Sequence, residues 1–217
     1  MLLMLMTIGG VVAAGVLLAV SLATGKTWLR NFVLGGVAVW LVFYGLMLFG
    51  FSLSSEEKIL ALNEPKEYCG FYLDCHMHTA VTDVQKTKAI GSKTAKGEFY
   101  IVKVKVFSDA KREPLQLVAT EAKVLDAQNN SYWRDVDAES ALGSQPDFET
   151  TIAPAENFTK SIVFDLPAGI KQPRLDIRDG YGIDTAIESV LVGDEDSVFH
   201  KRNYFELKEQ SQTARVN

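Results

Sequence analysis

The N-terminal part of the chain consists of two long apolar runs and one short polar loop. Residues 2–24 and 32–53 contain no charged side chain. Each run predicts a transmembrane helix, because a helix needs about 20 apolar residues to cross the hydrocarbon core of a bilayer. Seven residues, 25–31, join the two runs, and so short a linker makes the helices antiparallel neighbours. The pattern therefore predicts a membrane hairpin over residues 1–55.

A cleaved signal peptide is the alternative interpretation of the first run. Ser21-Leu22-Ala23 resembles a cleavage site. However, no basic segment precedes the run, and the run is longer than the usual apolar region of about 7–15 residues. Even after cleavage, the second helix would remain as a membrane anchor.

Beyond the hairpin, apolar and polar residues alternate. Val102, Val104 and Val106 share one face of the segment 99–107, and Lys103 and Lys105 lie on the other, which predicts a strand with one buried face. Further strands are predicted at residues 76–84, 119–125, 131–133, 158–166, 174–178, 189–192 and 204–207. Residues 185–191 fit a single helical turn equally well. Seven or eight short strands with frequent turn residues favour a β-sandwich.

Two of these segments resemble a known family. The stretch GEFYIVKVKV (residues 97–106) resembles the signature strand of bacterial immunoglobulin-like domains of unknown function, which are related to the mycobacterial immunoprotective extracellular antigen. TKSIVFDLP (159–167) followed by RLDI (174–177) is similar to the closing strands of that family. The resemblance implies an extracytoplasmic Ig-like sandwich without enzymatic activity. The hairpin departs from the lipoprotein anchor that is usual in the family.

These observations predict the organisation of the whole chain. The fold class is an N-terminal transmembrane α-helical hairpin plus an all-β Ig-like sandwich. We expect the hairpin at residues 1–55, a connector at 56–74, the sandwich at 75–208 and a disordered tail at 209–217.

Charge is distributed unevenly and bears on orientation. The hairpin has only two charged residues, Lys26 and Arg30, with Trp28 between them as an interfacial anchor. The positive-inside rule places this loop in the cytoplasm and the C-terminal domain outside, although Lys58 and Lys66 weaken the bias. The rest of the chain carries all 27 acidic residues and 20 of the 22 basic ones, a net charge of −7. An acidic domain gives no support to a nucleic-acid partner.

The two cysteines, Cys69 and Cys75, lie just after the hairpin, in CGFYLDCHMH. They predict a disulfide if the domain lies in an oxidising compartment, with a stabilisation of about 2–3 kcal/mol at most for so short a loop. The alternative is a copper or zinc site, because Cys, His and Met are soft or borderline ligands. In an extended chain, His76 and His78 share one face, and Met77 lies on the other. A third interpretation makes the histidines ordinary strand residues, with Met77 filling the core.

The remaining motifs give little indication of a metal site or a catalytic site. Asp194, Glu195 and Asp196 offer oxygen ligands for calcium, but EF-hand spacing is missing and an exposed acidic turn fits better. The sequence contains no Gly-x-Ser-x-Gly element and no phosphate-binding glycine loop.

We therefore expect a non-enzymatic interaction or scaffold protein without a cofactor. It would be held in the inner membrane by lipid contacts, as a multi-pass protein, and would bind another membrane or periplasmic protein. The alternative function is copper or zinc binding or delivery by the cluster at residues 69–78. An enzyme whose active site the sequence does not reveal is the third possibility.

Overall fold

The computed structural model describes residues 2–69 and 75–209. Clustering of contacts divides the chain into two compact units. The first contains Met1–Glu56 and Ile183–Arg202, and the second contains Glu57–Gly182 and Asn203–Asn217. The predicted disordered tail, residues 209–217, lies outside the described residues from position 210 on.

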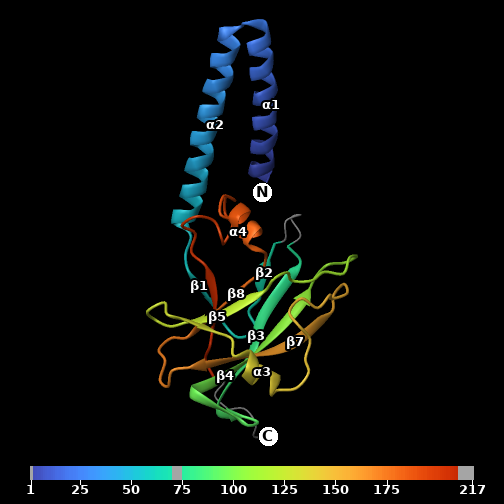
Figure 1. Ribbon diagram of the computed structural model, residues 1–217, viewed down its shortest axis with the longest axis vertical. Helices are drawn as coiled ribbons and strands as arrows, with labels where there is room; N and C mark the ends of the chain where they lie inside the picture. Colours follow the sequence, from blue (N-terminus) through green and yellow to red (C-terminus); the bar gives the residue numbers. More distant parts are fainter. Residues whose placement is uncertain (1, 70–74, 210–217) are drawn as a thin grey trace. The chain divides into compact units, whose positions relative to one another are not determined.

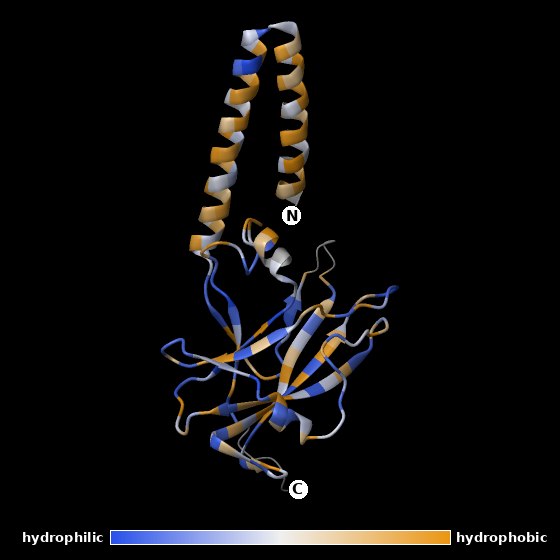
Figure 2. Cartoon of the chain, in the orientation of Figure 1, coloured by the Kyte–Doolittle hydropathy of each residue, from blue (hydrophilic) through white to orange (hydrophobic). Residues whose placement is uncertain are grey.

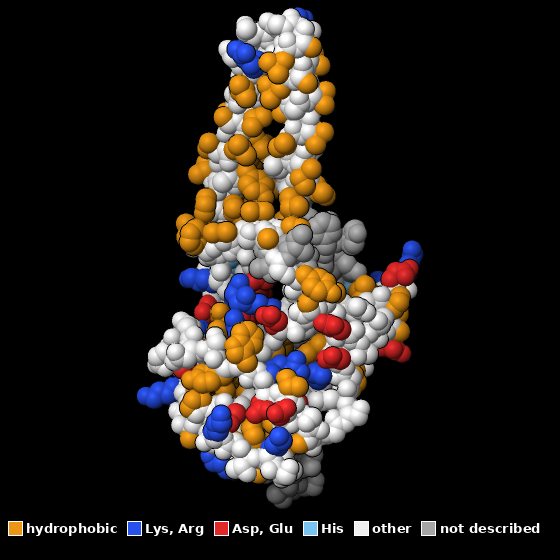
Figure 3. Space-filling view, in the orientation of Figure 1, with side chains coloured by type: hydrophobic (Ala, Val, Ile, Leu, Met, Phe, Trp, Pro, Cys, Tyr) orange, Lys and Arg blue, Asp and Glu red, His pale blue; other side chains and the backbone are white. Residues whose placement is uncertain are grey.

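The first unit is built on two long helices, α1 (Leu2–Thr24) and α2 (Thr27–Ser54), which lie side by side in Figure 1. Trp40 on α2 donates a hydrogen bond from its indole N–H to the Thr7 hydroxyl on α1, at 3.0 Å. Figure 2 shows that both helices are apolar over most of their length, and Figure 3 shows hydrophobic side chains along their visible surface. The predicted hairpin of apolar helices is confirmed.

The predicted start of the second helix, at residue 32, is wrong. Helix α2 begins at Thr27, so the turn between the helices contains only Gly25 and Lys26. Gly25 takes a positive φ of 66°, which glycine adopts at little cost, and this conformation ends α1. Trp28 and Arg30 therefore lie in the first turns of α2 and not in a loop. The prediction took the charged residue Arg30 to lie outside the helix. A helix can continue beyond the hydrocarbon core, where charged side chains are tolerated, so the apolar run marks only part of α2.

The second unit is a sandwich of two sheets. One sheet has the order β1-β9-β8-β5-β6, with β1 parallel to β9 and the other pairs antiparallel. Its strands are β1 (Lys58–Leu60), β5 (Glu121–Leu125), β6 (Ser131–Trp133), β8 (Arg174–Arg178) and β9 (Asn203–Glu206). The other sheet is antiparallel, in the order β2-β3-β4-β7. Its strands are β2 (Lys66–Tyr68), β3 (Met77–Ile90), β4 (Lys93–Ser108) and β7 (Asn157–Leu166).

The core lies between the two sheets, as the alternating pattern predicted. Val102, Val104 and Val106 of β4 are fully buried, whereas Lys103 points to the other face and pairs with Asp83 at 3.2 Å. The facing sheet contributes fully buried side chains from β5, β8 and β9, namely Val124, Leu175, Ile177 and Phe205. Burial of these branched and aromatic groups is the main force that holds the sheets together.

A short helix, α3 (Val136–Ser140), covers part of the outer face of the second sheet. Its Ala138 packs with Phe99 of β4 and Val163 of β7 in a separate small cluster. The Asp135 carboxylate caps α3 by accepting a hydrogen bond from the Ala138 N–H at 2.9 Å. A helix of five residues leaves no periodic pattern, and the sequence did not predict it.

Two further boundaries differ from prediction. The expected connector, residues 56–74, contains β1 and β2, while its residues 70–74 lie outside the described part of the chain. Three-residue strands are too short to show alternation. The predicted strand at 189–192 is also wrong: α4 (Gly182–Glu188) and a series of turns occupy this region. Residues 189–192 belong to the first compact unit, so their apolar side chains are not part of the sandwich.

Candidate functional site

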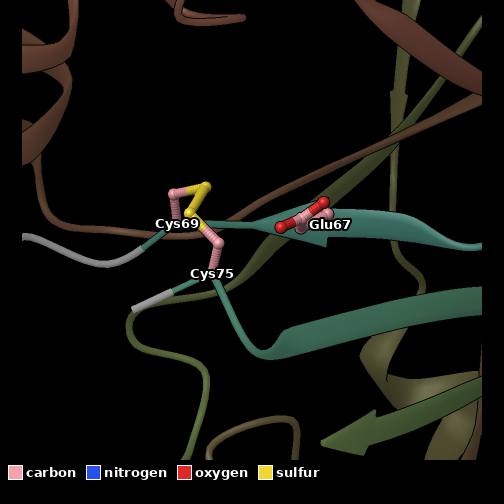
Figure 4. Close-up of side chains that lie close together, drawn as sticks. All are labelled: Glu67, Cys69 and Cys75. Carbon is pink, nitrogen blue, oxygen red and sulfur yellow. A yellow bond between two sulfur atoms is a disulfide. The ribbon is translucent and has the colours of Figure 1, made fainter. Parts of the chain in front are cut away.

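The disulfide predicted between Cys69 and Cys75 is confirmed. Pairing of β2 with β3 sets Tyr68 opposite Met77, which brings the two cysteines together at the end of this strand pair where the chain passes from β2 to β3. Figure 4 shows the cystine next to Glu67. The sulfur atoms and the Glu67 carboxylate all lie within 4.8 Å of one another. Both sulfurs are used in the covalent bond, so they cannot act as thiolate ligands in this state.

The structure brings His76 and His78 to the same aspartate. The imidazole Nδ1–H of His76 donates to Asp109 Oδ1 at 2.6 Å, and Nε2 of His78 lies 3.5 Å from the same oxygen. The hydrogen bond from His76 lowers the pKa of Asp109 below its ordinary value. His78 is mostly buried, stacks on the Phe107 ring, and leaves its Nδ1 without a hydrogen-bond partner among the described residues.

The positions of these side chains reduce the number of residues that could act as ligands at the predicted metal site. Met77 is buried in the core between the sheets, away from the two imidazoles, as the core interpretation expected. Of the residues first considered, His76 and His78 both approach Asp109, which follows the end of β4. Sequence analysis missed Asp109 because it is 33 positions from His76. Copper or zinc binding stays a prediction.

A second group of polar side chains lies between the two sheets. The Lys66 amine is buried and donates to the Ile177 carbonyl at 2.9 Å. The Tyr68 hydroxyl donates to the same carbonyl at 3.3 Å and shares a hydrogen bond with the Thr79 hydroxyl at 2.9 Å. These bonds satisfy groups that would be costly to bury alone. The cluster links strands β2, β3 and β8, which gives it a structural role.

A shallow depression of about 590 Å³ lies on the surface of the sandwich. It is lined by residues 131–137, which run from β6 to the start of α3, and by Lys96 of β4 and Asp165 of β7. Two large apolar side chains are exposed here: Trp133 is 59% exposed and Val136 is 66% exposed. The amine of Lys123 lies 5.5 Å from the centre of the Trp133 ring, a cation–π contact.

Several polar groups around this depression already have partners within the domain. Arg134 donates two hydrogen bonds to the Glu139 carboxylate, at 2.8 and 2.6 Å. The Asp165 carboxylate accepts hydrogen bonds from the backbone N–H groups of Lys96 and Gly97, at 2.8 and 2.9 Å. These polar groups are engaged within the domain, and the side chains of Trp133 and Val136 are exposed beside them.

The fold and these surfaces define a class of protein: a hairpin of two long apolar helices joined to a β-sandwich that carries a disulfide. The sequence profile of a domain family, described as domain of unknown function DUF4352, matches residues 74–187. The match covers more than half of the chain, and the protein belongs to this family. The family resemblance predicted from the strand motifs is confirmed.

Solved structures of several bacterial proteins are similar to this chain. The secreted protein MPT63 of Mycobacterium tuberculosis is 14% identical, with a TM-score of 0.43, and the match covers 70% of this chain and 97% of that protein. The yjhA protein of Bacillus subtilis is 14% identical, with a TM-score of 0.44, over 69% of this chain and 100% of its own.

An uncharacterised β-sandwich protein of Clostridium difficile is 10% identical, with a TM-score of 0.36, over 71% of this chain and 98% of its own. No match was found among curated proteins.

Proposed function

We propose that this chain is a membrane-anchored, non-enzymatic binding protein that presents its sandwich on the extracytoplasmic side of a bacterial inner membrane. The two apolar helices support the anchor. Their most apolar windows are 0% and 11% buried within the chain, far less than in helices that form the core of a soluble protein. Lipid would cover the side chains that the protein itself leaves exposed.

The charges at the turn of the hairpin and the disulfide support the orientation. Lys26, Trp28 and Arg30 lie at the end of the hairpin where α1 and α2 meet, and positive charges favour the cytoplasmic side. The disulfide Cys69–Cys75 follows α2 and would persist in an oxidising compartment. These two independent features favour the same topology.

The observation that carries the binding role is the exposed pair Trp133 and Val136. Aromatic side chains are enriched at protein–protein interfaces, and tryptophan is prominent among the residues that contribute most binding energy. The neighbouring Arg134 is held in place by Glu139, so the surface around Trp133 is ordered before a partner arrives. The proposed partner is another membrane or periplasmic protein.

Photo-crosslinking in intact cells tests this role. A photoreactive amino acid that replaces Val136 is expected to give a discrete adduct with one protein. The same amino acid at Lys111, an exposed position on another loop, serves as the control and should not give that adduct. The substitution Trp133→Ala should abolish the adduct while circular dichroism shows an unchanged fold. An adduct that survives Trp133→Ala, or no adduct at position 136, would overturn the proposal.

A further inference from the structure

The chain between β8 and β9 leaves the sandwich and joins the helical hairpin. Strands β8 and β9 are neighbours in one sheet, yet residues 183–202 between them belong to the first compact unit. This insertion begins in helix α4 and continues through a series of turns to Arg202. Two adjacent antiparallel strands need only a short turn, so the length of the insertion is not required by the sheet.

Several contacts fix the insertion along the last turns of α2. The Tyr44 hydroxyl donates to the Val190 carbonyl at 2.5 Å. The buried hydroxyls of Ser52 and Ser197 share a hydrogen bond at 2.9 Å. The backbone N–H of Lys201 donates to the Ser55 hydroxyl at 2.8 Å. From Tyr44 to Ser55, an α-helix rises about 16 Å, so the insertion follows roughly three turns of α2.

The insertion exposes apolar side chains beside this part of the helix. Phe199 is 68% exposed, and Val190 and Val198 are 44% and 38% exposed. The Phe199 ring lies 6.0 Å from the ring of Phe49 on α2, which is itself 45% exposed. The exposed apolar surface of the helix therefore continues onto the insertion.

The backbone at Phe199 is held in an unusual conformation. Its φ is 65°, in the left-handed region that bulky side chains rarely adopt. Hydrogen bonds on either side fix the turn: Val198 N–H donates to the Ser189 carbonyl at 2.9 Å, and His200 N–H donates to the Ser197 carbonyl at 3.0 Å. Such a conformation is unfavourable for a bulky residue and persists where the surroundings enforce it. Here it presents an aromatic ring outward.

The length of α2 places this ring near one boundary of a bilayer. The helix has 28 residues, or about 42 Å of rise, whereas the hydrocarbon core is about 30 Å thick. If Trp28 and Arg30 mark the first interface, the hydrocarbon core ends about 20 residues later, near Gly50. The contact between Phe49 and Phe199 then lies at the second interface, where aromatic side chains are enriched.

We infer that residues 186–200 form an interfacial element of the anchor, which inserts Phe199, Val198 and Val190 into the lipid leaflet that surrounds the C-terminal end of α2. This inference rests on the proposed membrane anchoring of the hairpin. The occupant of the apolar surface is the boundary between lipid headgroups and acyl chains. Among the acidic side chains of the same segment, Asp196 pairs with Arg202 at 2.6 Å.

Quenching by nitroxide-labelled lipids tests this inference on the full chain. Phe199→Cys and, separately, Val198→Cys are labelled with a thiol-reactive fluorophore, because the native cystine does not react. The protein is reconstituted in vesicles of phosphatidylcholine and phosphatidylglycerol that contain nitroxides near the headgroup or deep in the acyl region. Two further labelled variants serve as references: Val39→Cys in the middle of α2, 71% exposed, and Val136→Cys on the sandwich, 66% exposed.

The expected result is that shallow nitroxides quench labels at 198 and 199 several-fold more strongly than the label at 136, while deep nitroxides quench the label at 39. Quenching at 39 together with values at 198 and 199 equal to that at 136 would overturn the interfacial element and leave the anchor intact. Absence of quenching at 39 would overturn the anchor itself, and the inference with it. The two labels in the insertion guard against a local disturbance at Phe199.

Discussion

A single carboxylate, Asp126, organises the turn between β5 and β6. Its Oδ1 accepts hydrogen bonds from the backbone N–H groups of Gln128 and Asn130, at 2.8 and 2.9 Å. Its Oδ2 accepts from the Asn130 side-chain amide at 2.8 Å and from the Tyr132 hydroxyl at 3.2 Å. These donors, the Asn130 side chain foremost, lower the pKa of Asp126 below its ordinary value of 3.8. The charged form therefore favours the folded state.

The pH dependence of stability follows from this shift. A carboxyl group with a lowered folded-state pKa contributes stability above its unfolded pKa, and loses it as the pH falls through the folded pKa. Asp126→Asn is therefore expected to destabilise the domain above pH 3.8, and the difference from wild type should shrink as the pH falls further. Urea unfolding of both proteins over a pH series measures it. A difference that does not vary with pH would contradict the assignment.

At the residue scale, the sequence identified some side chains and missed others. Cys69 and Cys75 were recognised because only two cysteines exist and they lie close together in the chain. Asp109 was missed because nothing in its surroundings links it to His76. Trp133 was read only as part of a short strand, because exposure of an aromatic side chain depends on what packs over it.

At the scale of elements, strand β4 passes very close to the end of β7. A Cβ added at Gly97 would lie 2.0 Å from the Leu166 carbonyl oxygen and 3.0 Å from Pro167 Cα. Both are backbone atoms, so no side-chain rotation can make room for the added Cβ. The Asp165 carboxylate also accepts a hydrogen bond from the Gly97 N–H. The close approach of the two strands is therefore fixed by the lack of room for a side chain and by this hydrogen bond.

The substitution Gly97→Ala is expected to destabilise the sandwich by about 1–3 kcal/mol, because the methyl group forces β4 and β7 apart. Gly182→Ala is the matched control, since nothing lies within 4 Å of a Cβ at that position, and a change within about 0.5 kcal/mol is expected for it. Denaturant unfolding measures both values. Equal stability of the two variants would show that the strands can adjust.

The outer edge of β7 forms hydrogen bonds with side chains from other parts of the chain. Gln145 binds Ser161 in the manner of a neighbouring strand: its side-chain N–H donates to the Ser161 carbonyl at 2.7 Å, and its carbonyl accepts from the Ser161 N–H at 2.8 Å. Glu139 accepts from the Val163 N–H at 3.1 Å. These contacts occupy edge groups that would otherwise invite pairing with another chain.

At the scale of the whole molecule, the chain combines a hairpin of exposed apolar helices with a sandwich that has its own core. Buried residues from both sheets form that core within residues 60–207, and none of them comes from the hairpin. The charge is divided in the same way, with all acidic residues outside the hairpin. Such a division suits a protein that is held in a membrane and presents a domain to water.

The proposed orientation of the chain in the membrane leads to a prediction that a C-terminal reporter can test. A reporter fused after Asn217 should be active if it works only outside the cytoplasm, and inactive if it works only inside. Intact mass should rise by two hydrogens on reduction, because the Cys69–Cys75 disulfide forms in an oxidising compartment. Cys69→Ser is the control and should remove that mass difference. A reporter active only in the cytoplasm would reverse the topology.

The sequence by itself determined the apolar hairpin, the sandwich class, the family and the cysteine pair. These features rest on local properties: run length, absence of charge, alternation along a strand and proximity in the chain. Only the tertiary structure decided that β1 pairs with β9, that His76 meets Asp109, and that residues 183–202 pack on α2. Periodicity reports that one face of a segment is buried, but it does not report which distant segment buries it.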